Sequence, residues 1–247
     1  DVYKRQVTVS RASCKELAAL APFASDKISV VPNSLGAHFE HSFGREAVDP
    51  ELLELQRRPY VLGVFSNTKP HKRLHDLVEA FAAVKARAEF ESLTLVLAGM
   101  GFEAGSHEWV QEQYWLRGKG YGHLLNDINV LGMVSKTQLV SLYRQARVLA
   151  VPSIAEGFCL PALEARALGT AVVARSVPAV RELLGEGDYV ADGNNIAAFE
   201  RALLRALRDR LDHENHAEIC PEVVSKYSIE RAAGETFGVY QQAMILG

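Results

Sequence analysis

The sequence is poor in cysteine, and its three cysteines (Cys14, Cys159 and Cys220) are scattered along 247 residues. An odd, widely spaced set fits neither a disulfide scaffold nor a zinc site, so a reducing compartment is expected. An excess of charge is also lacking, because the formal net charge is −3 and the pI is about 6.3. General binding to nucleic acid needs a basic surface and is therefore not expected.

Long apolar runs are lacking as well. No stretch approaches the roughly 18 consecutive apolar residues that indicate a transmembrane helix. No signal-peptide pattern opens the chain, and the first six residues have no assigned role. A hydrophobic content of 48% and a charged content of 23% are typical of a globular protein. We therefore expect a cytoplasmic protein with one large or two small domains.

The most informative stretch runs from Val148 to Ala174. Residues 148–151 predict a buried strand, Pro161 opens a helix, Gly169 closes it, and residues 171–174 begin the next strand. This order is typical of a parallel α/β sheet. In such sheets ligands bind beyond the carboxyl ends of the strands, where the loop before the helix lies.

That loop and helix carry two glutamates, Glu156 and Glu164, with seven residues between them. The free amides of residues 158–160 and the positive end of the helix dipole favour an anion beside them. Two carboxylates accept hydrogen bonds from hydroxyl groups. A sugar nucleotide, with hydroxyls and phosphates, suits this set of groups. The alternative is that Glu156 is a solvated loop residue and Glu164 a surface helix residue.

The text EGFCLPALEARALGTAVVAR, which contains both glutamates, resembles the signature EGFGLPxLEAMAxGxPVVAS of the retaining glycosyltransferases with the GT-B fold, family four. Departures include Cys159 for Gly, Arg166 for an apolar residue and Ala171 for Pro. Cys159 matters most, because Gly permits a close backbone approach and cysteine restricts φ. The resemblance implies an α/β fold: a Rossmann-like parallel sheet with helices on both faces, plus a partial first domain.

Two loops and one turn resemble other segments of this family. The loop SNTKPHKR (66–73) resembles VGNxKPHKNL, which implies that Lys72 and Asn67 hold the donor diphosphate. The turn at Gly99 resembles a glycine-rich turn near the phosphates, and Val134 falls in a segment whose backbone reads the base. The alternatives are a solvated basic loop for Lys72 and a plain tight turn for Gly99.

The resemblance also implies a division of the chain. Residues 1–50 would be a remnant of the N-terminal acceptor domain and a linker, and residues 51–225 the nucleotide-sugar-binding domain. Residues 226–247 would form the C-terminal crossover helix, returning to the first domain. Its apolar stripe comprises Ile229, Ala232, Ala233, Phe237, Tyr240 and Met244. A plain βαβ fragment explains the first segment equally well.

The implied function is the donor-binding part of a retaining hexosyltransferase. It would move mannose or glucose from a nucleoside diphosphate sugar to a hydroxyl of a carbohydrate or lipid-linked acceptor, as in polysaccharide biosynthesis. Glu156 and Lys72 would be catalytic. Donor contacts would come from Asn67, Lys72, Gly99, Val134, Glu156, Gly157, Phe158, Cys159, Leu160 and Glu164.

No metal or other cofactor is implied, since lysine and the helix dipole take the place of a cation. The missing domain would hold most acceptor contacts, so this stretch alone is expected to be inactive; that domain could also make a peripheral contact at the inner membrane face. Two alternatives remain: a nucleotide-sugar epimerase of the same fold, and a non-catalytic domain that binds sugar nucleotides.

Overall fold

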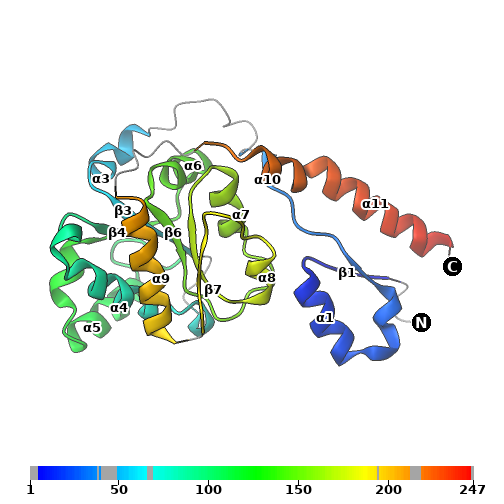
Figure 1. Cartoon of the computed structure of the whole chain (residues 1–247), viewed down its shortest axis with the longest axis horizontal. Coiled ribbons are helices and arrows are strands. Elements are labelled where there is room, and N and C mark those ends of the chain that lie inside the picture. Colours follow the sequence, from blue (N-terminus) through cyan, green and yellow to red (C-terminus); the bar gives the residue numbers. More distant parts are fainter. Residues whose placement is uncertain are drawn as a thin grey trace.

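The structure is a computed structural model that describes residues 5–37, 39, 49–65, 69–193, 195–211 and 218–245. Figure 1 shows a six-stranded α/β body, a smaller part around α1 (Arg11–Leu20), and the long helix α11 (Ile229–Ile245). Within the described ranges, no helix has the length and apolar character needed to cross a membrane. Asn67, one of the expected diphosphate ligands, lies outside the described residues.

The large sheet has the order β5-β4-β3-β6-β7-β8, and every pairing in it is parallel. The chain runs from β3 outward to β5, then returns to place β6 on the other side of β3. The order reverses between β3 and β6, which is where doubly wound sheets bind ligands. The strands are β3 (Tyr60–Phe65), β4 (Thr94–Gly99), β5 (Ile128–Gly132), β6 (Val148–Val151), β7 (Val172–Arg175) and β8 (Tyr189–Ala191).

Successive side chains of the central strand β3 point to opposite faces of the sheet, so the strand contributes to a hydrophobic core on each face. Val61 and Phe65 of β3 pack on one face, and Tyr60 and Leu62 pack on the other. The first face is covered by α4 (Leu74–Lys85), α5 (His107–Gly118) and α9 (Ile196–Asp209). The second is covered by α6 (Lys136–Gln145), α7 (Leu160–Ala167), α8 (Pro178–Arg181) and α10 (Pro221–Lys226). The predicted fold class, a parallel sheet with helices on both faces, is confirmed.

The smaller part consists of β1 (Gln6–Thr8) paired in parallel with β2 (Ile28–Val30), joined by α1 and a 3₁₀ turn. Two oxygens of Glu182, just past α8, accept hydrogen bonds from the amides of Arg11 (3.0 Å) and Ala12 (2.8 Å). These amides belong to the first turn of α1 and have no partner inside the helix. A residue of the large body thus caps a helix of the small part. The proposed domain boundaries stay a prediction.

Two apolar residues near the expected boundary at residue 50 are packed into the large body. Phe39 and Leu52 are buried in the core that covers the second sheet face, and Phe39 packs against the ring of Tyr143. A 3₁₀ turn (Pro50–Leu52) and α3 (Leu53–Gln56) lead from this boundary to β3.

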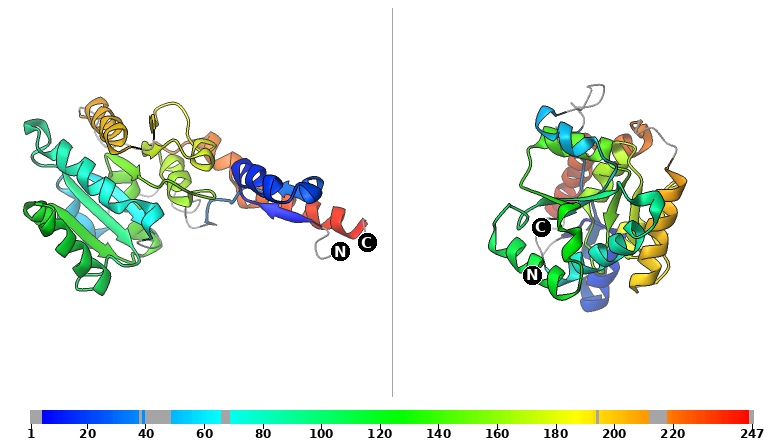
Figure 2. Two further views of the ribbon diagram at one scale, coloured as in Figure 1. Left: turned by 90° about the horizontal axis from the view of Figure 1, so that it is seen from below. Right: turned by 90° about the vertical axis from the view of Figure 1, so that its left-hand side faces the viewer.

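The apolar stripe of the last helix is largely exposed in the described residues. Phe237, Tyr240 and Met244 are 58–69% exposed, and Val239, which is not in that stripe, is buried. Figures 1 and 2 show why: α11 projects away from the six-stranded body. A hydrogen bond from Arg231 to the Pro32 carbonyl (2.8 Å) ties its start to the chain after β2.

Candidate functional site

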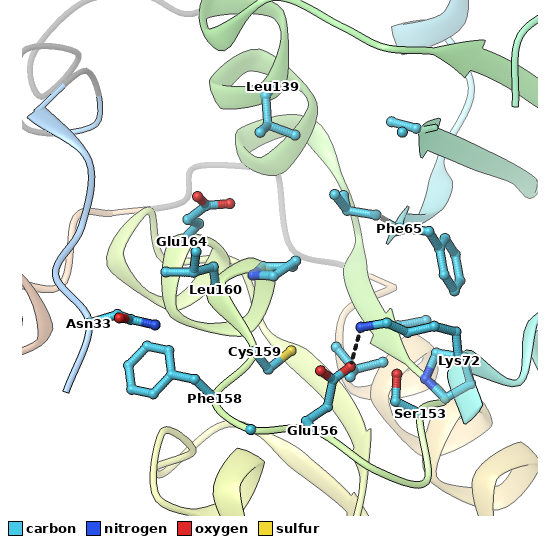
Figure 3. A pocket seen from close by; sticks show the side chains of 18 of the residues that line it. Asn33, Phe65, Lys72, Leu139, Ser153, Glu156, Phe158, Cys159, Leu160 and Glu164 are labelled. Carbon is cyan, nitrogen blue, oxygen red and sulfur yellow. Dashed lines mark hydrogen bonds and ion pairs between the residues drawn. The ribbon is translucent and has the colours of Figure 1, made fainter. Parts of the chain in front are cut away.

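A cavity of about 540 Å³ opens at the carboxyl edge of the sheet, above the point where β3 and β6 diverge. Its floor is made by the ends of β3, β4 and β6, and its side by the loop before α7 and the first turns of that helix. Figure 3 shows several of the lining side chains. Nine of the ten expected site residues line it: Lys72, Gly99, Val134, Glu156, Gly157, Phe158, Cys159, Leu160 and Glu164.

Lys72 and Glu156 meet at one end of the cavity, where Nζ lies 2.8 Å from Oε1 (Figure 3). Lys72 ends a short 3₁₀ turn that Pro70 opens, and a hydrogen bond from the Ile154 amide to the His71 carbonyl (2.9 Å) joins this turn to the loop carrying Glu156. The two side chains are only 16% and 11% exposed. Neither is therefore a solvated loop residue, as the alternative interpretation held.

Glu164 lies deeper, one turn into α7, and accepts a hydrogen bond from the Tyr143 hydroxyl at 2.8 Å. Burial raises the pKa of the Glu164 carboxyl, and the tyrosine hydrogen bond partly opposes that rise. Tyr143 is fully buried, as expected of a core residue, and burial raises its own pKa well above the usual value. The sequence did not reveal its contact with Glu164, because the two residues come from different helices.

Cys159 lies between the two glutamates, directly before α7. Its φ is +83°, in the left-handed region that glycine adopts without strain. This is the position where the family signature has Gly, so the cysteine keeps the glycine-like backbone. Burial, together with the charge of Glu156, raises the pKa of its thiol to about 12. The group therefore stays a neutral thiol at neutral pH.

The amides of Phe158, Cys159 and Leu160 precede the first full turn of α7. Among the described residues, no backbone hydrogen bond uses any of these three amides as donor. They lie on the lining of the cavity, together with the positive end of the helix. The cavity therefore offers an anion both a lysine and a set of backbone donors.

Gly99 ends β4 with φ of +118°, and a Cβ there would lie 1.8 Å from the Phe65 carbonyl oxygen. The glycine is thus required where the ends of β3 and β4 come together under the cavity. Val134 lies in the turn after β5, next to the exposed side chain of Met133, and both line the cavity.

The small N-terminal part also contributes to the cavity, through Val9 and Asn33. Ser13 of α1 donates a hydrogen bond to the Gly157 carbonyl at 3.3 Å. Sequence reasoning did not select these residues. Their contact with the cavity depends on how the small part and the large body pack together.

No group of three His, Cys, Asp or Glu side chains in the described ranges is arranged to hold a metal ion. The charged groups that face the cavity are Lys72, Glu156 and Glu164. One cation is paired with one carboxylate, and the second carboxylate is held by a neutral hydroxyl.

Comparison with solved structures identifies the fold. A glycosyltransferase from Rickettsia africae superposes with a TM-score of 0.77 at 19% identity, over 98% of this chain and 64% of that one. Anabaena HepE, solved in complex with UDP-glucose, gives a TM-score of 0.72 at 18% identity, over 96% of this chain and 63% of that one. At these identities the likeness defines the fold, which is that of the GT-B glycosyltransferases.

Sequence comparison then defines the family. Residues 48–221 match the model of the glycosyl transferases group 1 family, and this chain belongs to that family. The O-antigen chain mannosyltransferase B of Escherichia coli is 26% identical over 245 residues, which is 98% of this chain and 61% of that protein. The chain thus spans less than two thirds of the length of this relative.

Proposed function

We propose that this chain provides the donor-binding half of a retaining hexosyltransferase. The reaction transfers a hexose of the mannose or glucose type from a nucleoside diphosphate to a hydroxyl of a carbohydrate or lipid-linked acceptor. The bond from the anomeric carbon to the diphosphate breaks, a bond to the acceptor oxygen forms with the configuration kept, and the proton of the acceptor hydroxyl is released with the nucleoside diphosphate. Membership of a glycosyl transferase family and the likeness to a mannosyltransferase support this proposal.

One observation carries the assignment of roles. Lys72 and the stretch 156–164, which holds both glutamates and the amides of residues 158–160, are far apart in the chain, yet they line one cavity at the switch point of the sheet. Such a cavity holds groups for both halves of a sugar nucleotide. The amides and Lys72 suit the diphosphate, and the two carboxylates suit hydroxyl groups.

In the proposed complex Lys72 stabilises the charge that develops on the leaving diphosphate, and no metal takes part. The ammonium now 2.8 Å from Glu156 would turn to the phosphate oxygens. Glu156, freed from that pair, would accept hydrogen bonds from the hexose hydroxyls. Glu164, oriented by Tyr143, would accept the ribose hydroxyls. Val134 would lie against the base.

The working environment follows from the same proposal. Nucleoside diphosphate sugars are the expected donors, and the likeness to an O-antigen chain enzyme supports a role in polysaccharide synthesis. A cytoplasmic location is part of the same proposal. Contact with the inner face of a membrane would involve parts of the protein beyond this cavity.

Calorimetric titration with UDP, GDP and ADP tests the donor site and identifies the base. We expect one nucleotide to bind, and Glu164→Gln to weaken it by about 10- to 100-fold, the range for a hydrogen bond to a charged group. Glu186→Gln is the matched control, because Glu186 is exposed and does not line the cavity. Equal affinity of Glu164→Gln and the unchanged chain would contradict the ribose assignment.

Donor turnover separates an enzyme from a binding module. An assay for release of the nucleoside diphosphate from the matching sugar nucleotide, run on a protein with the complete acceptor part, should show turnover that Lys72→Ala lowers. Binding without any release in that protein would favour the non-catalytic alternative, and Cys159 is the departure that most directly supports it.

A further inference from the structure

A buried network of charges lies beside the turn that carries Lys72. Asp76, in the first turn of α4, is 7% exposed, and Arg175, at the end of β7, is completely buried. The Arg175 guanidinium is bonded to the Asp76 carboxylate, and its positive charge also lies 5.7 Å from the centre of the Phe199 ring in α9. Arg175 therefore links the strand to two helices through one side chain.

The same carboxylate holds a second arginine. Arg73 donates from Nε and from one terminal nitrogen to the two oxygens of Asp76, at 2.9 Å each. This is a bidentate pair, the geometry in which a guanidinium gives most directional constraint. Asp76 thus joins Arg73, which is 44% exposed, to the fully buried Arg175.

Arg73 also has an unusual backbone. Its φ is +53° and ψ +44°, the left-handed region that costs about 1–2 kcal/mol for a residue other than glycine. It follows Lys72 directly, ending the 3₁₀ turn and starting α4. Such a backbone persists only where surrounding contacts fix it. Backbone hydrogen bonds join Arg73 to Pro70, Asp76 and Leu77, and the bidentate pair with Asp76 adds a side-chain contact to them.

Both arginines depart from the family texts quoted above. Arg73 stands where VGNxKPHKNL has Asn, and Arg175 stands where PVVAS has Ser. The two positions are 102 residues apart in the chain, yet both side chains bind one carboxylate. The two departures therefore form a single structural unit in this protein.

We propose that Arg73, Asp76 and Arg175 are positioning residues that set the place of the Lys72 ammonium, with Arg175 as the fixed anchor on the sheet. The proposal rests on the proposed function of Lys72 as the diphosphate ligand. Arg175 holds the Asp76 carboxylate, and Asp76 holds the Arg73 side chain. Arg73 is joined to Lys72 by one peptide bond, so these contacts restrict where Lys72 lies. On the other side, the hydrogen bond from Ile154 to His71 holds the turn against the loop of Glu156.

Arg73→Gln is the variant that tests this network. It removes the bidentate pair, keeps Lys72 and the Arg175–Asp76 pair, and changes a side chain that is partly exposed, so folding is preserved. Arg57→Gln is the matched control, since Arg57 forms an i,i+3 pair with Glu54 in which both side chains are more than 70% exposed.

The first measurement needs no ligand. After correction for the intrinsic rates of the two side chains, amide hydrogen exchange at position 73 and at Ile154 should become about tenfold faster in Arg73→Gln, equal to about 1.4 kcal/mol of local opening, and stay unchanged in Arg57→Gln. Exchange as slow as in the unchanged chain would overturn the proposal. Because no nucleotide is used, this result stands even if the donor assignment fails.

The second measurement compares two ligands. The affinity for the bound nucleoside diphosphate should fall about tenfold in Arg73→Gln, while the affinity for the nucleoside of the same base stays the same. Equal losses for both ligands would mean a general structural effect and would overturn the positioning role. Absence of nucleotide binding by the unchanged chain would count against the proposed function, and the exchange experiment would then decide the present proposal.

Discussion

The two glutamates of the motif lie in one cavity but in different electrostatic surroundings. Glu156 lies against a cation, with Lys72 Nζ at 2.8 Å, so its charge is compensated within the protein. In the part of the chain that the structure describes, the partner of Glu164 is the neutral Tyr143 hydroxyl at the same distance, and burial raises the pKa of its carboxyl. Two identical side chains with seven residues between them are thus placed in different electrostatic environments.

The difference shows what each carboxylate gains from a ligand. In the proposed complex a diphosphate would compete with Glu156 for Lys72, so binding there would exchange one ion pair for another. Glu164 is a half-buried carboxylate, and ligand hydroxyls would supply further hydrogen-bond donors to it. The first group therefore suits the reacting end of a donor, and the second suits a permanent recognition contact.

Of the changes considered, removal of the Lys72 ammonium, which pairs with Glu156, should have the largest effect. Lys72→Ala is expected to weaken binding of the nucleoside diphosphate by about 1.5–3 kcal/mol, because a charged hydrogen bond is lost, and to leave binding of the free nucleoside unchanged. Calorimetry with both ligands measures this, with exposed Lys119→Ala as the control. Equal losses for the two ligands would show that Lys72 does not contact the phosphates.

Removing the hydroxyl should have a smaller effect with a characteristic pH dependence. Tyr143→Phe takes away the hydrogen bond that lowers the pKa of Glu164, so that pKa rises further above the ordinary 4.5. A carboxyl whose pKa is higher in the folded than in the unfolded state binds its proton more tightly when folded. Its contribution to stability therefore falls as the pH rises from the unfolded pKa to the folded pKa. Well below the ordinary pKa the Glu164 carboxyl is protonated in the folded and the unfolded state alike, in the unchanged chain and in the variant.

We therefore expect Tyr143→Phe to lower the free energy of unfolding by about 0.5–1.5 kcal/mol at neutral pH, and by less in acid. The acidic limb of nucleotide binding should move to higher pH. Urea unfolding and titrations across the pH range check both outcomes. A mutational effect on stability that is the same at every pH would show that Glu164 does not depend on this hydroxyl.

The smallest effect is expected for the residue between the two glutamates. Cys159→Gly removes the strain of a left-handed backbone but also a buried side chain, and each change is worth about 1 kcal/mol. The free energy of unfolding should therefore change by less than about 1 kcal/mol, with the contacts of both glutamates kept. A much larger loss in urea unfolding would mean that the thiol itself supports the loop.

Local patterns predicted much of the fold and the cavity. The apolar run 148–151 and the helix opened by Pro161 were predicted from adjacent residues, and the structure has β6 and α7 there. The motif with Glu156 and Glu164 encodes a loop and a helix start, so its geometry follows from short-range rules.

Contacts between distant residues could not be predicted in this way. The bond from Tyr143 to Glu164 and that from Arg175 to Asp76 depend on which helix packs against which strand. The apolar stripe of α11 was a correct periodicity, but its burial depends on a neighbour that periodicity does not specify. The assignment of Asn67 lies outside the described residues and stays a prediction.

The capping of α1 by Glu182 has a consequence for how the protein forms. The carboxylate that completes the first turn of this helix is 171 residues further along the chain than Arg11. At synthesis rates of about 5–20 residues per second, the cap emerges roughly 10–30 s after the helix it stabilises. On the ribosome, the helix of residues 11–20 therefore lacks this cap until Glu182 has been synthesised.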